Sequence, residues 1–509
     1  MPKTTEQSPA AARRLGLASG FADLIEGAPR AAFAAFLALH FAVWTALPAV
    51  FYANLPLDLI EALTYGREWQ LGYDKLPPLP WWLVEIVHRG FGADAAYYAL
   101  AQMVVLAAFV AVWATARPLV GATGALVAVL IIDGLHYFQY TAVKFNHDVI
   151  QLPFWALAGY AFHAALKRGR LIDWLLLGAA FGGALWAKYF VAVLAAPYAL
   201  FMIFDRDARR ALARPGPWLA LIVALVIAAP HVVWLFQNDF LPFAYAEQRA
   251  APLRGWYDHI VHPVVFFGSQ IFFALPSLFI AAPLLWPQPQ THAPADADAF
   301  DRRIVTLIAF GPGIAMIVLT AASGRGTFAM WGYPLWLYVG LWVVLRLRPR
   351  LDRPRLAHIV AHWGVVFALF AIVFAVNYSV LPLFDHRYRA VFYPGDKLAA
   401  VLTQRFHDAT GTKLRYVVGS MWDGGNLAHY SPDQPQVLID ALPQRAPWID
   451  PADLRRAGAI VVWTGGDTAN LPPSFAPIAG TAQVGAPFEL PMRRGGGTLH
   501  VGWALMKPQ

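Results

Sequence analysis

The sequence predicts a polytopic α-helical membrane protein with about eleven transmembrane helices and a small C-terminal extracytoplasmic α/β domain. The composition, a series of long apolar runs and the end of those runs near residue 380 predict this class. Of 509 residues, 58% are hydrophobic and only 14% are charged, whereas soluble proteins carry roughly 25% charged residues. A soluble protein of this composition could not cover its surface with polar groups, so most of the chain must face lipid.

Apolar runs divide the first three quarters of the chain. A helix needs roughly 20 mostly apolar residues to cross a bilayer. Lys188-Tyr189 interrupts the longest stretch, 171–204, which we therefore interpret as a helical hairpin. The eleven predicted spans are 31–53, 94–116, 119–137, 148–166, 171–187, 189–204, 217–236, 263–286, 304–322, 328–345 and 357–378, each with soft boundaries.

The placement of Lys and Arg residues predicts the orientation of these spans. With the N-terminus in the cytoplasm, the inside segments are richer in positive charge than the outside loops at every pair of loops. An odd number of spans places the C-terminus in the periplasm. We therefore predict an inner-membrane protein with a cytoplasmic leader (1–30), a transmembrane domain with its working loops on the outer face (31–380) and a periplasmic domain (381–509). This bias also explains the net charge of +8, so we predict no nucleic-acid partner.

Residues 381–509 have the pattern of a small soluble domain. Pro394-Gly395-Asp396 is expected to open an amphipathic helix that ends near Gly411. Alternation of helix and strand favours a partly parallel sheet. Gly495-Gly496-Gly497 predicts a hairpin or loop, because it lacks the context of a phosphate-binding motif. Short β-like runs are expected at 414–418, 437–439, 459–463 and 498–505.

Carboxylates gather just after the first span. If this segment is helical, Asp58 and Glu61 lie one turn apart and can face one cavity. A carboxylate in a half-apolar site can accept a proton from a hydroxyl group. The alternative for each is a solvated loop carboxylate. Asp148 is a further candidate, although it begins a predicted helix and can equally serve as a cap.

Three cations on the predicted outer face are candidates for binding a phosphate: Lys75, Lys188 and Arg325. A cation stabilises the charge that grows on a leaving phosphate, and it does so best away from water. The alternative is contact with lipid headgroups. Pro77, Pro78 and Pro80 are expected to stiffen the loop that carries Lys75. The predicted substrate contacts are Tyr73, Asp74, His147, Trp331 and Tyr333.

The residue content also limits the cofactors. The chain has no cysteine, which excludes disulfides, thiolate metal sites and cysteine nucleophiles. His147 and His262 are too scattered to indicate a zinc site. We therefore predict no cofactor, with a divalent cation on Asp58, Asp148 and Asp239 as a weaker alternative.

Four segments together resemble the GT-C class of membrane glycosyltransferases. The chain is similar to the broad family that includes protein O-mannosyltransferases, lipid A aminoarabinose transferases and rhizobial galacturonosyltransferases. The resemblance covers about residues 31–345. It rests on Asp58, on Tyr73-Asp74-Lys75-x-Pro77-Pro78, on Phe145-Asn146-x-Asp148 with Pro153-Phe154-Trp155, and on the aromatic and proline residues of 328–337.

This resemblance implies an enzyme that uses a polyprenyl-phosphate sugar on the outer face. It implies Asp58 as general base, Lys75 as a phosphate contact and Asp148 as a second acidic residue. The chain departs from a common pattern of the family, because Leu59 follows Asp58 where an acid is usual; Glu61 is a candidate to compensate.

We therefore predict an inverting transferase that moves a sugar from a polyprenyl-phosphate donor to a hydroxyl group of a lipid, glycan or protein. The partners are that donor, that acceptor and membrane lipids. Two alternatives remain open: a transporter or lipid flippase, and a non-catalytic membrane anchor for residues 381–509. A transporter should show paired, broken helices in two related halves, and the sequence shows no such halves.

Overall fold

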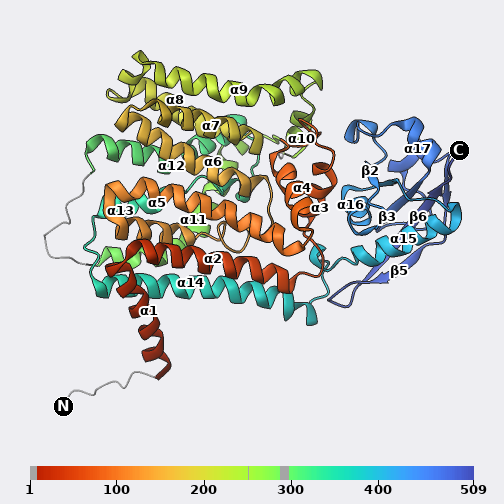
Figure 1. The fold of residues 1–509 in the computed structure, drawn as a ribbon, viewed down its shortest axis with the longest axis horizontal. Coiled ribbons are helices and arrows are strands. Elements are labelled where there is room, and N and C mark those ends of the chain that lie inside the picture. Colours follow the sequence, from red (N-terminus) through yellow and green to blue (C-terminus); the bar gives the residue numbers. More distant parts are fainter. Residues whose placement is uncertain (1–8, 250–251, 287–296) are drawn as a thin grey trace. The chain divides into compact units, whose positions relative to one another are not determined.

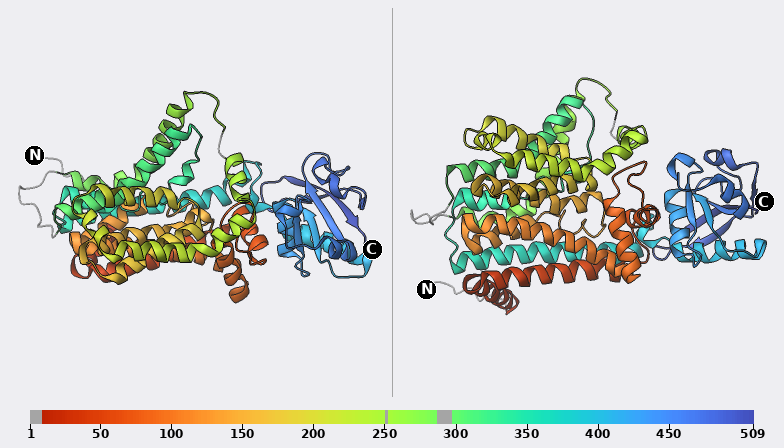
Figure 2. Two further views of the ribbon diagram at one scale, coloured as in Figure 1. Left: turned by 90° about the horizontal axis from the view of Figure 1, so that it is seen from above. Right: turned by 45° about the horizontal axis from the view of Figure 1, so that its top comes forward.

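The computed structural model describes residues 9–249, 252–286 and 297–509. The chain forms two compact units, and each is described by itself (Figures 1 and 2). Unit 1 comprises residues 1–46, 101–143 and 147–373, and unit 2 comprises residues 47–100, 144–146 and 374–509. The divisions fall inside helices α2, α5 and α14. The predicted domain limits at residues 30 and 380 stay predictions.

Unit 1 is helical throughout its described part. Helix α7 packs against α6 and α9, and α12 packs against α8 and α11; α6, α7 and α9 run alongside one another in Figure 1. Its long helices, three of them shared with unit 2, are α1 (Pro9–Gly27), α2 (Pro29–Phe51), α5 (Asp94–Asp133), α6 (His147–Arg168), α7 (Leu171–Ala187), α8 (Val191–Phe204), α9 (Pro215–Gln237), α11 (Asp258–Ala281), α12 (Ala299–Ser323) and α14 (Arg353–Ser379). Its shorter elements are η1 (Ala208–Ala213), α10 (Leu241–Arg249), η2 (Ala282–Leu285), η3 (Ala329–Gly332) and α13 (Val339–Leu347).

Seven segments of the described chain are long and apolar enough to cross a bilayer: α2, α5, α6, α9, α11 with η2, α12, and α14 with its continuation to Leu383. Two shorter apolar helices, α7 and α8, form the pair predicted on either side of Lys188-Tyr189. The predicted spans 94–116 and 119–137 form one element, α5, with a break at Gly121 (φ 73°, ψ 170°). The predicted span 328–345 contains η3 and only the first seven residues of α13. The predicted class of polytopic helical membrane protein is confirmed.

One polar cluster inside unit 1 joins three helices. Asp133 of α5 is fully buried and lies 3.1 Å from Nδ1 of His40 on α2. Its other oxygen accepts hydrogen bonds from Trp363 of α14 (2.7 Å) and from Gln139 (3.0 Å). A buried ionisable side chain is costly unless it is paired, and these partners explain how Asp133 is tolerated within apolar surroundings.

Unit 2 contains two short helices between the ends of α2 and α5. Helix α3 (Leu57–Gly66) begins after Pro56, and α4 (Leu79–Phe91) begins after Pro78. Proline is well tolerated in the first turn of a helix, because its missing N–H has no partner there. Pro80 therefore lies in the first turn of α4 and does not stiffen a loop, which corrects our prediction. Gly66 lets the two helices meet, since an added Cβ would lie 2.3 Å from the Trp81 carbonyl oxygen.

The C-terminal part of unit 2 is a mixed sheet in the order β2-β1-β3-β6-β4, with β5 paired to β6. β1 is parallel to β2 and β3, while β6 is antiparallel to β3, β4 and β5, so the prediction of a partly parallel sheet is confirmed. The strands are β1 (Tyr416–Gly419), β2 (Gln436–Ile439), β3 (Ala459–Thr464), β4 (Ala482–Val484), β5 (Phe488–Pro491) and β6 (Thr498–Met506). The helices and turns are η4 (Leu381–Leu383), η5 (Ala390–Phe392), α15 (Gly395–Thr410), α16 (Met421–Tyr430), η6 (Pro443–Arg445), α17 (Pro451–Ala457) and η7 (Pro473–Ile478).

Both faces of this sheet are covered. Val417, Ile460 and Val462 pack with buried residues of α15 on one face, whereas Val418 and Val461 pack with residues of α17 and η7 on the other. Side chains alternate between faces along a strand, which explains why neighbouring valines enter different clusters. The predicted helix after Pro394 is α15, and it ends where predicted, at Gly411 (φ 67°). The predicted hairpin also forms, because residues 492–497 connect the antiparallel strands β5 and β6.

Candidate functional site

Helix α3 presents the two carboxylates that the sequence singles out. Asp58 lies in the first turn of α3 and is half-buried, while Glu61 is 8% exposed. The predicted spacing of one helical turn is therefore present. A carboxylate in the first turn of a helix interacts favourably with the helix dipole, and Asp58 occupies such a position.

Asp58 lies at the wall of a cavity of about 310 Å³ in unit 2, which we call the Asp58 cavity. Its Oδ2 accepts a hydrogen bond of 2.9 Å from the side-chain amide of Asn146. This bond fixes the orientation of the carboxylate. The cavity is lined by Pro56, Leu57, Asp58, Lys144, Asn377, Tyr378, Arg389, Ala390 and Val391. It thus combines one carboxylate with two cations, Lys144 and Arg389.

Lys75 contacts the second carboxylate of α3. Its Nζ lies 2.9 Å from Oε2 of Glu61. Burial raises the pKa of the Glu61 carboxyl, Lys75 opposes that shift, and the charges of Asp58 and Asp74 add to it. Glu61 therefore lies close enough to Lys75, Asp58 and Asp74 in unit 2 for their charges to act on it.

The segment before Lys75 is fixed by the C-terminal domain. Asp74 accepts a hydrogen bond from the Tyr65 hydroxyl (2.5 Å) and forms an ion pair with Nε of Arg445 (2.8 Å). Arg445 also pairs with Asp440. The Tyr73 side chain is 2% exposed, and its hydroxyl donates to the Tyr65 carbonyl oxygen (2.7 Å). Tyr73 and Asp74 thus make structural contacts here, and their predicted contacts with substrate stay predictions.

A second carboxylate–lysine pair lies in unit 1. Asp148, in the first turn of α6, forms an ion pair with Lys188, and both residues are less than 10% exposed. The Lys188 ammonium lies 4.7 Å from the ring centroid of Phe190 and 5.8 Å from that of Trp331. The structure therefore brings together three predicted site residues, Asp148, Lys188 and Trp331, in aromatic surroundings.

The other predicted residues of unit 1 lie in different environments. Arg325 forms an ion pair of 3.0 Å with Glu247, and its side chain is 39% exposed. Tyr333 is 2% exposed and packs against Tyr137 in a tilted arrangement, with ring centroids 4.6 Å apart. His147 is 6% exposed. Their proposed roles in binding substrate stay predictions.

Among the described residues, no group of three or more His, Cys, Asp or Glu side chains is arranged to hold a metal ion. Whether the protein requires a divalent cation stays untested by this arrangement. At the Asp58 cavity the structure places one carboxylate, Asp58, and two cations, Lys144 and Arg389.

Sequence reasoning assigned no role in this region to Lys144, Arg389 or Arg445, and Asn146 entered only as part of the Phe145-Asn146-x-Asp148 segment that carries the resemblance. Asn146 lies 88 positions from Asp58, and Arg445 lies 371 positions from Asp74. The one signal for Arg389 was the charged stretch 385–389, which directly follows the last apolar run. The partners themselves become visible only when the chain is folded.

A larger polar cavity of about 510 Å³ lies elsewhere in unit 2 and is lined by residues of α3, α4 and α16. Glu68 at its wall accepts a hydrogen bond of 2.8 Å from Gln436. Burial raises the pKa of Glu68 to about 7, a shift that Arg67 and Gln436 only partly oppose. This carboxylate is therefore a second titratable group of unit 2, separate from the Asp58 cavity.

Comparisons of sequence support the resemblance noted above. The profile of the dolichyl-phosphate-mannose-protein mannosyltransferase family matches residues 75–234. The lipid A galacturonosyltransferase RgtD of Rhizobium johnstonii is 24% identical over 327 residues, which cover 62% of this chain and 66% of RgtD. The lipopolysaccharide core galacturonosyltransferase RgtB of the same organism is 28% identical over 217 residues, 42% of this chain and 43% of RgtB. The matched part thus spans about two thirds of the first relative and less than half of the second.

Solved structures share the fold. The crystal structure of ArnT from Cupriavidus metallidurans bound to undecaprenyl phosphate superimposes with a TM-score of 0.62 at 13% identity, covering 92% of this chain and 97% of ArnT. The apo structure of ArnT gives a TM-score of 0.61 at 14% identity with the same coverage. The similarity therefore extends over both the helical part and the C-terminal domain. At this low sequence identity it shows a shared fold.

Proposed function

By fold and by sequence similarity the chain is a GT-C membrane protein, and we propose that it is a glycosyltransferase that moves a sugar from a polyprenyl-phosphate donor to a hydroxyl group of a lipid or glycan. The observation that carries this proposal is the Asp58 cavity, which is lined by a hydrogen-bonded carboxylate and by two cations. The names of RgtD and RgtB and the undecaprenyl phosphate bound to ArnT support the same class of reaction.

The proposed reaction needs one base and one leaving group. Asp58 removes the proton from the acceptor hydroxyl group. The oxygen of that hydroxyl group attacks the anomeric carbon of the donor at the same time. The bond between that carbon and the phosphate oxygen breaks, and the polyprenyl phosphate leaves with the electron pair, so the anomeric configuration inverts. A positioned general base contributes roughly 10²- to 10⁴-fold to such a rate. Asn146 positions the carboxylate through its hydrogen bond to Oδ2.

The negative charge that grows on the phosphate requires nearby cations. We propose Lys75 for this role, as the sequence predicts, together with Lys144 and Arg389 at the wall of the Asp58 cavity. Asp74 and Arg445 act indirectly, because they hold the segment that carries Lys75. Asp148 and Lys188 keep their predicted roles, as a second acid and as a phosphate contact, as separate hypotheses about unit 1.

The relatives suggest the first substrates to test. We propose galacturonic acid as the sugar and lipid A or the lipopolysaccharide core as the acceptor, because these appear in the names of RgtD and RgtB. We also propose that the N-terminus is cytoplasmic and that unit 2 carries its reaction on the periplasmic face, since the distribution of Lys and Arg favours this orientation.

The test is transfer by the purified full-length protein. Supplied with polyprenyl-phosphate-linked galacturonic acid and lipid A, it should produce glycosylated lipid A and release one polyprenyl phosphate for each sugar transferred, both measured by mass spectrometry. In parallel, lipids of a strain that lacks the gene should contain a glycan shortened by one sugar. The proposal is wrong if no lipid-phosphate sugar is consumed and the lipids of that strain are unchanged.

A further inference from the structure

Three arginines line a cavity of about 490 Å³ in unit 1. Arg302 comes from the first turns of α12, and Arg346 and Arg348 come from the end of α13. Leu345 and Leu347 complete the lining, which contains no carboxylate. We call this the arginine cavity.

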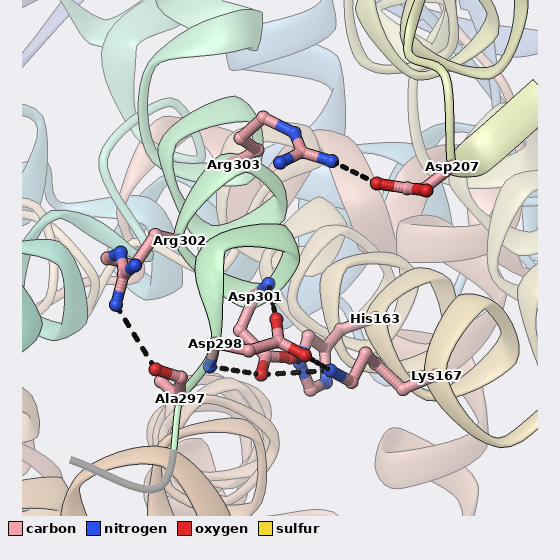
Figure 3. Close-up of polar contacts among 8 residues, drawn as sticks. All are labelled: His163, Lys167, Asp207, Ala297, Asp298, Asp301, Arg302 and Arg303. Carbon is pink, nitrogen blue, oxygen red and sulfur yellow. Dashed lines mark hydrogen bonds and ion pairs between the residues drawn. The ribbon is translucent and has the colours of Figure 1, made fainter.

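Arg302 and Arg303 are consecutive residues of α12, and they differ in their partners. Arg303 contacts Asp205 (2.7 Å) and Asp207 (2.6 Å), whereas Arg302 points away from it and donates a hydrogen bond of 3.2 Å to the Ala297 carbonyl oxygen (Figure 3). A carbonyl oxygen balances less charge than a carboxylate does. Arg302 therefore keeps most of its positive charge available within the cavity.

The carboxylates beside Arg302 are already engaged by other cations. Asp298 accepts a hydrogen bond of 2.7 Å from Lys167, and Asp301 accepts from Lys167 (3.0 Å) and lies 2.8 Å from Nε2 of His163 (Figure 3). The two aspartates also cap the start of α12 through each other's backbone N–H groups. Both carboxylates thus pair with side chains of α6 and with backbone N–H groups at the start of α12, and not with the arginines of the cavity.

The two arginines of α13 are placed by the end of that helix. Arg346 lies in the last turn and is exposed, and Arg348 ends the helix in the left-handed conformation (φ 47°, ψ 54°). For a residue other than glycine this conformation costs roughly 1–2 kcal/mol. In the described ranges, neither side chain has a carboxylate within ion-pair distance. Three like charges around one cavity repel one another, and a bound anion would relieve that repulsion.

We propose that the arginine cavity binds a phosphate group, presented by the headgroup of an anionic phospholipid or as free phosphate. Guanidinium groups match phosphate oxygens with paired hydrogen bonds. Basic pockets at the ends of transmembrane helices suit acidic headgroups, and two leucines in the lining suit the adjoining part of a lipid. This site is separate from the proposed transfer of sugar, since it uses none of the residues assigned to that reaction.

The experiment measures ligand-dependent stability of the full-length protein in a neutral detergent. Short-chain phosphatidylglycerol, short-chain phosphatidylcholine and inorganic phosphate are each titrated while the melting temperature is recorded. We expect phosphatidylglycerol to raise the melting temperature and phosphatidylcholine to leave it unchanged. A full shift with inorganic phosphate identifies free phosphate as a sufficient ligand, whereas a shift with phosphatidylglycerol alone identifies the lipid headgroup.

The variant is Arg302→Gln/Arg346→Gln/Arg348→Gln. It should raise the half-maximal concentration of phosphatidylglycerol at least about tenfold, given roughly 1 kcal/mol for each basic residue. The control is Arg206→Gln/Arg209→Gln/Arg214→Gln, which removes the same charge from exposed arginines around η1 and should bind as the wild type does. Arg346→Gln alone serves if the triple variant fails to fold, with a smaller loss of affinity. Equal binding by the wild type and the folded arginine variants, or an equal response to phosphatidylcholine, would overturn the proposal.

Discussion

Two carboxylate–lysine pairs among the predicted site residues, one in unit 1 and one in unit 2, differ in their surroundings. In unit 1, Lys188 and Asp148 are nearly closed off from solvent, with side chains 8% and 9% exposed, and aromatic rings flank the ammonium group. In unit 2, the side chains of Lys75 and Glu61 are 16% and 11% exposed. Asp58 and Asp74 add further negative charge around the second pair.

This difference suggests a division of roles. An ion pair that is buried among apolar groups is costly to break, because the remaining charge loses its partner in a poorly solvated place. A lysine that several carboxylates surround can instead exchange one negative partner for another. We therefore expect the pair of unit 1 to matter more for stability, and the pair of unit 2 to matter more for turnover.

The largest expected effect on stability is that of Lys188→Met. Removal of one partner from a buried ion pair costs roughly 3–5 kcal/mol, since Asp148 then loses its ammonium partner. The free energy of unfolding in detergent should fall by about this amount, as measured by denaturant titration. The double variant Lys188→Met/Asp148→Asn should recover part of the loss. An unchanged stability of Lys188→Met would remove the proposed distinction between the two pairs.

Lys75→Met should act mainly on the reaction. We expect the rate of transfer to fall about 10- to 100-fold, because a cation near the leaving phosphate stabilises the charge that grows there. The melting temperature should change far less than in Lys188→Met. Lys413→Met, at an exposed position of the same unit, is the matched control and should keep the wild-type rate. Equal rates for Lys75→Met and the control would exclude Lys75 from the reaction.

Much of this comparison could be predicted from the sequence, and some of it could not. Asp58, Glu61 and Lys75 were identified because charges are scarce next to apolar runs, and that scarcity is a local property. Arg445, which holds Asp74, is distant in sequence, and nothing local distinguishes it from other arginines. The segment Phe145-Asn146-x-Asp148 includes Asn146, but its contact with Asp58, 88 positions away, is visible only in the folded chain.

The fold was predictable to a similar degree. Periodic and apolar segments such as α9 and α15 were found close to their observed bounds. Helix α16 was missed because Gly424-Gly425 in its middle disfavours a helix. The structure explains the exception, since a Cβ at Gly425 would lie 2.7 Å from both Ile60 and Thr64 of α3. Packing against α3 thus requires a glycine at position 425, and that glycine is one reason why the sequence did not predict α16.

Arg445→Gln should sharpen the comparison, because it alters unit 2 without removing a reacting group. Loss of the ion pair with Asp74 should loosen the segment before Lys75 and lower kcat about threefold to tenfold, equivalent to ~1 kcal/mol. Arg445→Lys should restore part of the rate, and Arg445→Gln should add little to Lys75→Met. Exposed Arg455→Gln is the control. Fully additive losses in the double variant would contradict a positioning role.

The smallest expected effect on the rate of transfer is that of Glu68→Gln, whose effect on stability depends on pH. Burial raises the pKa of Glu68 from its ordinary value of 4.5 to about 7, so the folded state favours the protonated form. The cost of ionising Glu68 therefore appears as pH rises from 4.5 to 7 and is complete above pH 7. Glu68→Gln should raise stability by up to about 3 kcal/mol at pH 8 and leave it nearly unchanged at pH 4.5. A gain that is the same at both pH values would show that the carboxylate does not titrate as described.

The measurement that tests the central claim most directly is the single-turnover rate of sugar transfer by Asp58→Asn, with donor lipid bound in advance. Asn keeps the size of the side chain and removes its capacity to accept the proton, so the rate should fall roughly 10²- to 10⁴-fold without a change in melting temperature. Asp408→Asn, an exposed carboxylate of α15 in the same unit, should transfer at the wild-type rate. A wild-type rate in folded Asp58→Asn would contradict the account.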